Sequence, residues 1–179
     1  MKCNGLLADS VTVTEDEGRV EFSLSGDDSV EYRLFMPHLV VIFLRNISSD
    51  APLIPVAKRE KFWLALGDSI TQGMDAKHPT HSYPSIISDY MGFDVLNAGI
   101  GGARFNANHL DRVGREPDLI TIALGCNDWG ISREDIISNV TAYIERVSSL
   151  YECRNIYAII PIWRGNENDV KACMTYQEH

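Results

Sequence analysis

The pattern of apolar and polar positions changes at about residue 60. Before that point, short runs with period-two alternation and one apolar run predict strands over residues 11–14, 19–25, 29–35 and 39–44. The cluster Gly26-Asp27-Asp28 predicts the turn of a hairpin between the second and third runs. We therefore expect residues 1–58 to form a partial β-sandwich, similar to a jelly roll, followed by a linker.

After residue 60, continuous apolar runs alternate with segments of helical periodicity. The apolar runs predict buried strands over residues 63–66, 93–96, 119–124 and 155–160. Ser82 and Ser132 are the predicted N-caps of two helices, the first ending at about Met91. In the first helix, the expected apolar stripe is Ile86, Ile87, Tyr90 and Met91. Strands and helices that alternate in this way predict an α/β domain with a parallel sheet over residues 59–179.

Composition and charge exclude several classes of partner. The chain has 179 residues, of which 45% are hydrophobic and 23% charged, as in a globular protein. A net charge of -9 disfavours nucleic acid as a partner. No run approaches the roughly 20 apolar residues that span a bilayer, and the N-terminus lacks a signal peptide's apolar core. We expect no membrane span and a cytoplasmic location.

The cysteines do not form a metal or redox motif. Their spacing includes no C-x-x-C pair, so we interpret as reduced thiols Cys3, Cys126, Cys153 and Cys173. No other residue pattern implies a metal or an organic cofactor.

Three glycine-containing turns follow predicted strands. They are Gly67-Asp68-Ser69, residues 97–102 and Gly125-Cys126-Asn127-Asp128. The carboxyl ends of parallel strands meet at one edge of a sheet, so these turns should converge on one crevice. Ser69 is the candidate nucleophile there, and the Ser69 N–H, the Gly102 N–H and the Asn127 amide are candidate donors to an oxyanion. The alternative is that Asp68-Ser69 only cap the next helix.

These three blocks, in this order over about residues 60–165, resemble the SGNH hydrolases, also called the GDSL esterase and lipase superfamily. The resemblance implies a flavodoxin-like three-layer α/β/α parallel sheet, here preceded by a small β-sandwich-like module. It also implies a serine esterase with Ser69 as nucleophile and with Gly102 and Asn127 in the oxyanion hole. The expected substrate is a small-molecule or carbohydrate ester, with a short-chain or acetyl group cleaved through an acyl-serine intermediate.

The sequence departs from the family in its fourth block. That block is an Asp-x-x-His, and residues 1–179 contain none after the predicted strands, so we expect the hydrolase domain to be truncated. His78 and His81 follow Ser69 closely, but solvated loop positions are the favoured interpretation for both, and helix surface for His109. Without a base, rates fall by on the order of 10^6. We therefore expect the chain to bind esters and turn them over very slowly.

Other interpretations stay open beside the esterase. A catalytically silent module could use the same crevice to bind a carbohydrate or ester, although it would not need the intact serine, glycine and asparagine set. The run from Gly99 to Arg104 resembles a dinucleotide fingerprint, but its last position is arginine. Trp129 could line an acyl or sugar pocket, and core packing is the commoner role. Unpaired strand edges would also allow homo-oligomers to form.

Overall fold

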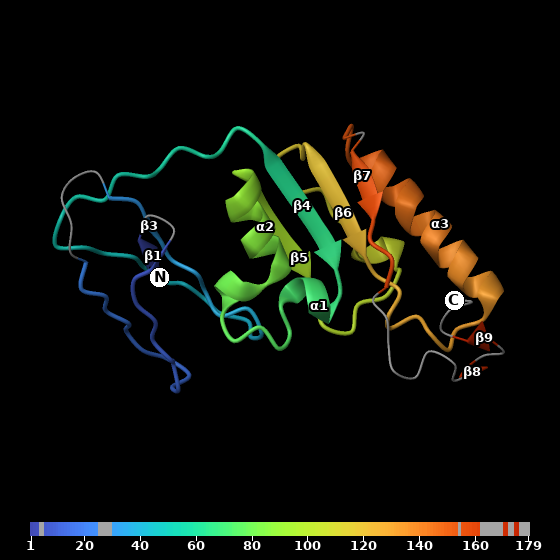
Figure 1. Ribbon diagram of the computed structural model, residues 1–179, viewed down its shortest axis with the longest axis horizontal. Helices are drawn as coiled ribbons and strands as arrows, with labels where there is room; N and C mark the ends of the chain where they lie inside the picture. Colours follow the sequence, from blue (N-terminus) through green and yellow to red (C-terminus); the bar gives the residue numbers. More distant parts are fainter. Residues whose placement is uncertain (4–5, 25–29, 154, 162–169, 172–173, 176–179) are drawn as a thin grey trace. The chain divides into compact units, whose positions relative to one another are not determined.

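The computed structural model describes residues 1–3, 6–24, 30–153, 155–161, 170–171 and 174–175 (Figure 1). The chain divides into two compact units, residues 1–57 and residues 58–179. We call them the N-terminal unit and the C-terminal unit and describe each by itself.

The N-terminal unit contains one small antiparallel sheet with the order β2-β1-β3. Its strands are β1 (Lys2–Cys3), β2 (Leu6–Leu7) and β3 (Tyr32–Arg33). The strands predicted over residues 11–14, 19–24 and 39–44 are absent, and that prediction is wrong. Alternation marks a potential face, but a strand also needs a partner and a covering layer. Phe43 is 90% exposed and Val41 is 86% exposed, so no layer of the described residues covers that run.

Part of the N-terminal prediction stays untested. Residues 25–29, which include the end of the second predicted strand and the hairpin turn, lie outside the described residues. Only β3 falls within the third predicted strand. The grouping of residues 1–58 as a partial β-sandwich and linker therefore stays a prediction.

The C-terminal unit is built on a four-stranded parallel sheet with the order β5-β4-β6-β7. The strands are β4 (Phe62–Gly67), β5 (Asp94–Gly99), β6 (Leu119–Ala123) and β7 (Ile156–Ala158). The first strand of the unit thus lies between the second and the third, which is the flavodoxin-like order. This confirms the predicted parallel α/β fold. A separate antiparallel pair is formed by β8 (Val170–Lys171) and β9 (Met174–Thr175).

The two longer helices begin where the sequence predicts. The short helix α1 (Ser69–Gln72) follows β4, and α2 (Tyr83–Met91) and α3 (Arg133–Leu150) are the two longer helices. Ser132 caps α3 by accepting a hydrogen bond from the Asp135 N–H at 3.1 Å. Ser82 precedes α2, but its hydroxyl donates to the Pro79 carbonyl instead of capping. Single 3-10 turns are η1 (Pro79–His81) and η2 (Ala107–His109).

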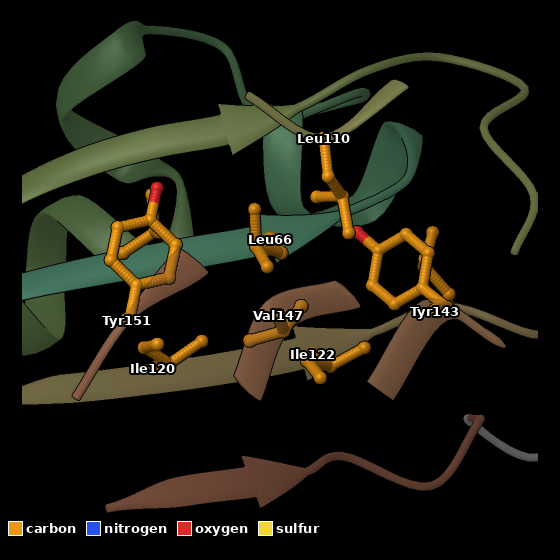
Figure 2. Close-up of a cluster of buried hydrophobic side chains, with 9 residues drawn as sticks. Leu66, Leu110, Ile120, Ile122, Tyr143, Val147 and Tyr151 are labelled. Atoms are coloured by element: carbon orange, nitrogen blue, oxygen red, sulfur yellow. The ribbon is translucent and has the colours of Figure 1, made fainter. Parts of the chain in front are cut away.

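Side chains of β4 and β6 point alternately to two covered faces. On one face, Leu64, Leu66, Ile120 and Ile122 form a core with residues of α3 and the adjoining loops; Figure 2 labels Leu66, Leu110, Ile120, Ile122, Tyr143, Val147 and Tyr151. On the other face, the Trp63 indole donates to the buried Thr121 hydroxyl at 2.9 Å. The Trp63 ring also lies 6.3 Å from the Tyr83 ring of α2. Helices α2 and α3 therefore cover opposite faces, which gives the predicted three layers.

The apolar stripe predicted for α2 is wrong. Ile86, Ile87, Tyr90 and Met91 are 54%, 38%, 91% and 46% exposed. The buried residues are Pro84 and Ser88 instead, which lie one turn apart on the face that packs on the sheet. The Ser88 hydroxyl donates a hydrogen bond to the Phe93 carbonyl at 2.7 Å. This bond lets a polar side chain be buried where an apolar one was expected.

None of the described helices combines the length and the apolar character needed to cross a bilayer. Cys3, Cys126 and Cys153 are not in disulfide bonds, and Cys173 lies outside the described residues.

Candidate active site

The carboxyl ends of three strands lie in register at one edge of the sheet. Gly67, the last residue of β4, pairs with Gly99 of β5 on one side and Ala123 of β6 on the other. The Ile100 N–H donates to the Gly67 carbonyl at 3.0 Å, and the Asp68 N–H donates to the Ala123 carbonyl at 3.3 Å. The three predicted turns therefore leave the sheet side by side.

Ser69 is the first residue of α1 and is half-buried. The residue before it, Asp68, is the N-cap: its carboxylate accepts the Ile70 N–H at 2.9 Å and is 2% exposed. The capping interpretation is thus right for Asp68 and not for Ser69, because the cap does not use the Ser69 hydroxyl. The buried carboxylate fixes the backbone that presents this hydroxyl.

Helix α1 lies so close to the strand ends that two glycines are required. A Cβ atom on Gly67 would lie 2.0 Å from the Thr71 hydroxyl oxygen, and one on Gly99 would lie 2.2 Å from the Gln72 backbone nitrogen. The sequence indicated a tight turn at Gly67, but it did not indicate that Gly99 is needed to seat the helix that carries Ser69.

The loop after β5 places Gly102 in a backbone turn. The Ala103 N–H donates to the Ile100 carbonyl at 3.0 Å, and Gly102 has a φ of +75°, a region that favours glycine. Asn97 connects the start of this loop to α1, because its amide nitrogen donates to the Thr71 carbonyl at 2.7 Å and its amide oxygen accepts the Gly99 N–H at 3.0 Å. Sequence patterns alone predicted no separate role for Asn97.

Asn127 reaches both of the other turns. Its amide nitrogen donates to the Ala103 carbonyl at 3.0 Å and lies 3.5 Å from a carboxylate oxygen of Asp68. The second distance is at the outer limit of a hydrogen bond, so that N–H is weakly held. Asp128, which is 1% exposed, accepts the Phe105 N–H at 3.3 Å and fixes the same loop farther along.

His78, His81 and His109 make contacts with partners other than Ser69. The rings of His78 and His81 pack edge to face with centroids 5.2 Å apart, and His109 is paired with the Asn106 amide at 3.2 Å. Within the described residues, no histidine is hydrogen-bonded to Ser69; His179 lies outside them. In the same part of the chain, no cluster of three or more His, Cys, Asp or Glu side chains is placed to hold a metal.

Tyr83 supports α1 from below and stays neutral. Its hydroxyl is hydrogen-bonded to the Thr71 hydroxyl at 2.9 Å, and Thr71 is fully buried. Burial raises the pKa of Tyr83 above its usual value, an effect that the hydrogen bond with Thr71 opposes and the nearby Asp68 charge reinforces. Tyr83 therefore holds the α1 residue Thr71 in place and is not a base at neutral pH.

An open depression of about 510 Å³ lies beside these turns. Its lining residues come from the loop after β5, the loop after β6 and helix α3: Arg104, Phe105, Asn106, Ala107, Asn108, Asp128, Ile131, Asn139 and Ala142. Trp129 is not among them and is 7% exposed, which confirms the core interpretation for this residue. We call this surface the Phe105 depression.

The sequence model of the GDSL-like Lipase/Acylhydrolase family matches residues 65–178. No curated protein matches the chain. Among solved structures, the chain is similar to AlinE4, described as an SGNH-hydrolase family esterase, with 25% identity, a TM-score of 0.45, and coverage of 52% of this chain and 56% of that one.

Two carbohydrate esterases share the fold. One is a family two carbohydrate esterase from Cellvibrio japonicus, with 20% identity, a TM-score of 0.52, and coverage of 64% of this chain and 46% of that one. The other is a carbohydrate esterase family 2 enzyme with a carbohydrate-binding domain, from Corynascus thermopiles (Myceliophthora fergusii). For it the identity is 18%, the TM-score 0.51, and the coverage 65% of this chain and 50% of that one. The chain thus spans about half the length of these structures.

Proposed function

Because this chain belongs to the GDSL-like lipase/acylhydrolase family, we propose that it contributes the nucleophile and the oxyanion hole of a serine esterase. The predicted family is thereby confirmed, while the site residues and the substrate are our proposal. The observation that carries it is the register of Gly67 with Gly99 and Ala123, which starts the three turns side by side.

In the proposed reaction, the Ser69 hydroxyl oxygen attacks the carbonyl carbon of an ester, and its proton passes to a general base. The carbonyl oxygen becomes an oxyanion, which the N–H groups of Ser69 and Gly102 and the Asn127 amide stabilise. The alcohol then leaves with the proton, and the acyl group stays on Ser69. Water hydrolyses this acyl-serine and releases the acid.

The hydrogen bonds of Asn127 support a donor role and add a requirement. One amide N–H is held by the Ala103 carbonyl at 3.0 Å, which fixes the plane of the amide. The other lies toward Asp68 at 3.5 Å and is the one we assign to the oxyanion. When the ester binds, the oxyanion replaces the Asp68 carboxylate as the partner of this N–H, which loses little because the contact at 3.5 Å is weak.

We assign no described residue as the base, so we propose that residues 1–179 by themselves bind acyl esters and hydrolyse them slowly. We further propose short-chain acyl esters, carbohydrate acetates among them, as substrates. The open Phe105 depression beside the turns, whose lining includes three asparagines, supports this choice.

The test is covalent labelling with a fluorophosphonate, located by peptide mass spectrometry. We expect the phosphonyl group on Ser69, no labelling in Ser69→Ala, and unchanged labelling in Ser138→Ala, which alters an exposed serine of α3. We also expect slow hydrolysis of p-nitrophenyl acetate by residues 1–179.

Several results would count against the proposal or a part of it. Labelling of a different residue, or ester hydrolysis that persists in Ser69→Ala, would remove Ser69 from the reaction. Ester binding with no labelling of Ser69 would identify the chain as a silent binding module instead. Fast hydrolysis by residues 1–179 would overturn only the slow-turnover part and would point to His78 or His81 as the base.

A further inference from the structure

Helix α1 is a single turn, so contacts from outside the helix must hold it in place. It spans Ser69–Gln72, and one helical turn is unfavourable by itself because it fixes several residues for few hydrogen bonds. At its first end, the Asp68 carboxylate accepts the Ile70 N–H. At its other end, the Thr71 carbonyl is one of the last four carbonyls, which have no partner within the helix. Thr71 is 0% exposed, so this carbonyl needs a partner from the protein.

Asn97 of β5 supplies that partner. Its amide nitrogen donates to the Thr71 carbonyl at 2.7 Å, and its amide oxygen accepts the Gly99 N–H at 3.0 Å. Both atoms belong to one planar carboxamide group. A single rigid group therefore joins the end of α1 to the start of the loop that follows β5.

The same loop carries the Gly102 N–H and lies directly against α1. The Ala103 N–H donates to the Ile100 carbonyl, which closes a turn over the two residues between them. A Cβ atom on Gly101 would lie 3.2 Å from the side-chain oxygen of Gln72, the last residue of α1. A movement of α1 relative to β5 therefore changes the separation between α1 and this loop.

The proposed reaction requires a defined separation between these two elements. The ester carbon bonds to the Ser69 hydroxyl oxygen on α1, while the oxygen on that carbon must reach the Gly102 N–H on the loop. A misplacement of about 1 Å between reacting groups can lower a rate about 100-fold. The residue that joins α1 to the loop is thus in a position to control the rate without contact with the substrate.

We infer that Asn97 is a positioning residue for the esterase reaction, which sets the separation between the Ser69 hydroxyl and the Gly102 N–H. The inference rests on the proposed function. Removal of the amide leaves the buried Thr71 carbonyl unpaired, and α1 shifts until water reaches that carbonyl. The shift carries Ser69 out of alignment with the oxyanion donors.

The test is the fluorophosphonate labelling of Ser69 over a range of probe concentrations, which separates the maximal rate constant from the half-saturating concentration. We expect Asn97→Ala to lower the maximal rate constant about tenfold, the effect of one lost hydrogen bond. The half-saturating concentration should stay within about twofold, because alignment with the oxyanion donors matters in the transition state and not in the first binding step.

A second variant, Asn97→Asp, separates the two hydrogen bonds of the carboxamide. The carboxylate keeps the size of the side chain and can still accept the Gly99 N–H, but it cannot donate to the Thr71 carbonyl. We expect Asn97→Asp to be labelled at least as slowly as Asn97→Ala.

The matched control is Asn155→Ala. The Asn155 amide also donates to a backbone carbonyl, that of Asp118 at 3.0 Å, but both residues precede the strands β7 and β6 and lie at the opposite edge of the sheet from Ser69. We expect Asn155→Ala to be labelled at the wild-type rate. Urea denaturation of all the variants shows how much stability each has lost.

Each outcome decides the inference. Wild-type labelling of Asn97→Ala or Asn97→Asp, or equal slowing in Asn155→Ala, would overturn it. A raised half-saturating concentration with an unchanged maximal rate constant would mean that Asn97 contacts the probe, which also overturns a positioning role. If neither Asn97 variant folds while Asn155→Ala does, Asn97 serves the fold and the inference is wrong.

Failure of the proposed function gives a different result. A wild-type protein that is not labelled at Ser69 would refute the esterase and the role of Asn97 with it. A wild-type protein that is labelled at Ser69, together with equal labelling of Asn97→Ala, would refute the role of Asn97 alone.

Discussion

Gly99→Ala tests whether the close contact between β5 and α1 positions the nucleophile. The added Cβ would lie 2.2 Å from the Gln72 nitrogen and 2.6 Å from the Thr71 carbonyl carbon, where ordinary contacts are at least 3.4 Å. Both are backbone atoms of α1, so no side chain can turn away to make room. The helix must move by about 1 Å, the difference between 3.4 and 2.2 Å.

Two measurements follow from this displacement. Overpacking of this kind costs about 1–3 kcal/mol in the free energy of unfolding, which urea denaturation measures. The displaced helix carries Ser69, and a misplacement of about 1 Å at a reacting group can lower the rate about 100-fold. We expect the rate constant for fluorophosphonate labelling of Ser69 to fall by that order.

The matched control is Gly114→Ala, because a Cβ at Gly114 would have no atom within 4 Å. We expect Gly114→Ala to match the wild type in both assays. The reasoning is refuted if Gly99→Ala and Gly114→Ala unfold at the same urea concentration and are labelled at the same rate. That result would mean that α1 packs less closely on β5 than the geometry indicates.

Three further predictions concern the stability of the C-terminal unit. Arg115→Met removes hydrogen bonds from the guanidinium to a carboxylate of β5 and to two backbone carbonyls. It should lower the free energy of unfolding, measured by urea denaturation, by about 1–3 kcal/mol. A loss no larger than that of Arg112→Met, whose ion pair is exposed, would contradict this. Trp63→Phe leaves the buried Thr121 hydroxyl without its donor and should lower the free energy of unfolding by about 1–3 kcal/mol. Most of this loss should be recovered when Thr121→Val is added. If the losses of the two substitutions simply add, the hydrogen bond contributes little. Burial raises the pKa of Tyr143 from 10.0 to about 12, so the stabilisation that comes from keeping its hydroxyl neutral is complete below about pH 10 and is lost as the pH rises through about 12. The free energy of unfolding of Tyr143→Phe should therefore fall less over this pH range than that of the wild type. Parallel curves for the two proteins would refute the assignment.

Local sequence patterns predicted most of the C-terminal unit. The run from Trp63 to Leu66 is apolar at every position because both faces of β4 are covered, and such a run identifies a buried strand without knowledge of its neighbours. The cap at Ser132 is likewise local, since donor and acceptor are three residues apart. The family blocks then placed Ser69, Gly102 and Asn127 at strand ends.

Elements that depend on distant partners were predicted less well. The α2 stripe was assigned to the wrong side, because a helix buries whichever face the sheet accepts, and here β5 accepts Pro84 and Ser88. The strand expected over residues 11–14 had the right alternation and the one over residues 39–44 was apolar throughout, but neither has a pairing partner among the described residues.

By itself, the sequence determined the order of strands and helices in the C-terminal unit and the three turns that hold the candidate site residues, because these follow from side chains a few positions apart. Tertiary structure alone decided that Asn127 holds the Ala103 carbonyl, that Asn97 connects the end of β5 to α1, and that Gly99 must lack a side chain. Each of these joins residues more than twenty positions apart, and such contacts exist only after the parallel strands have brought their ends together.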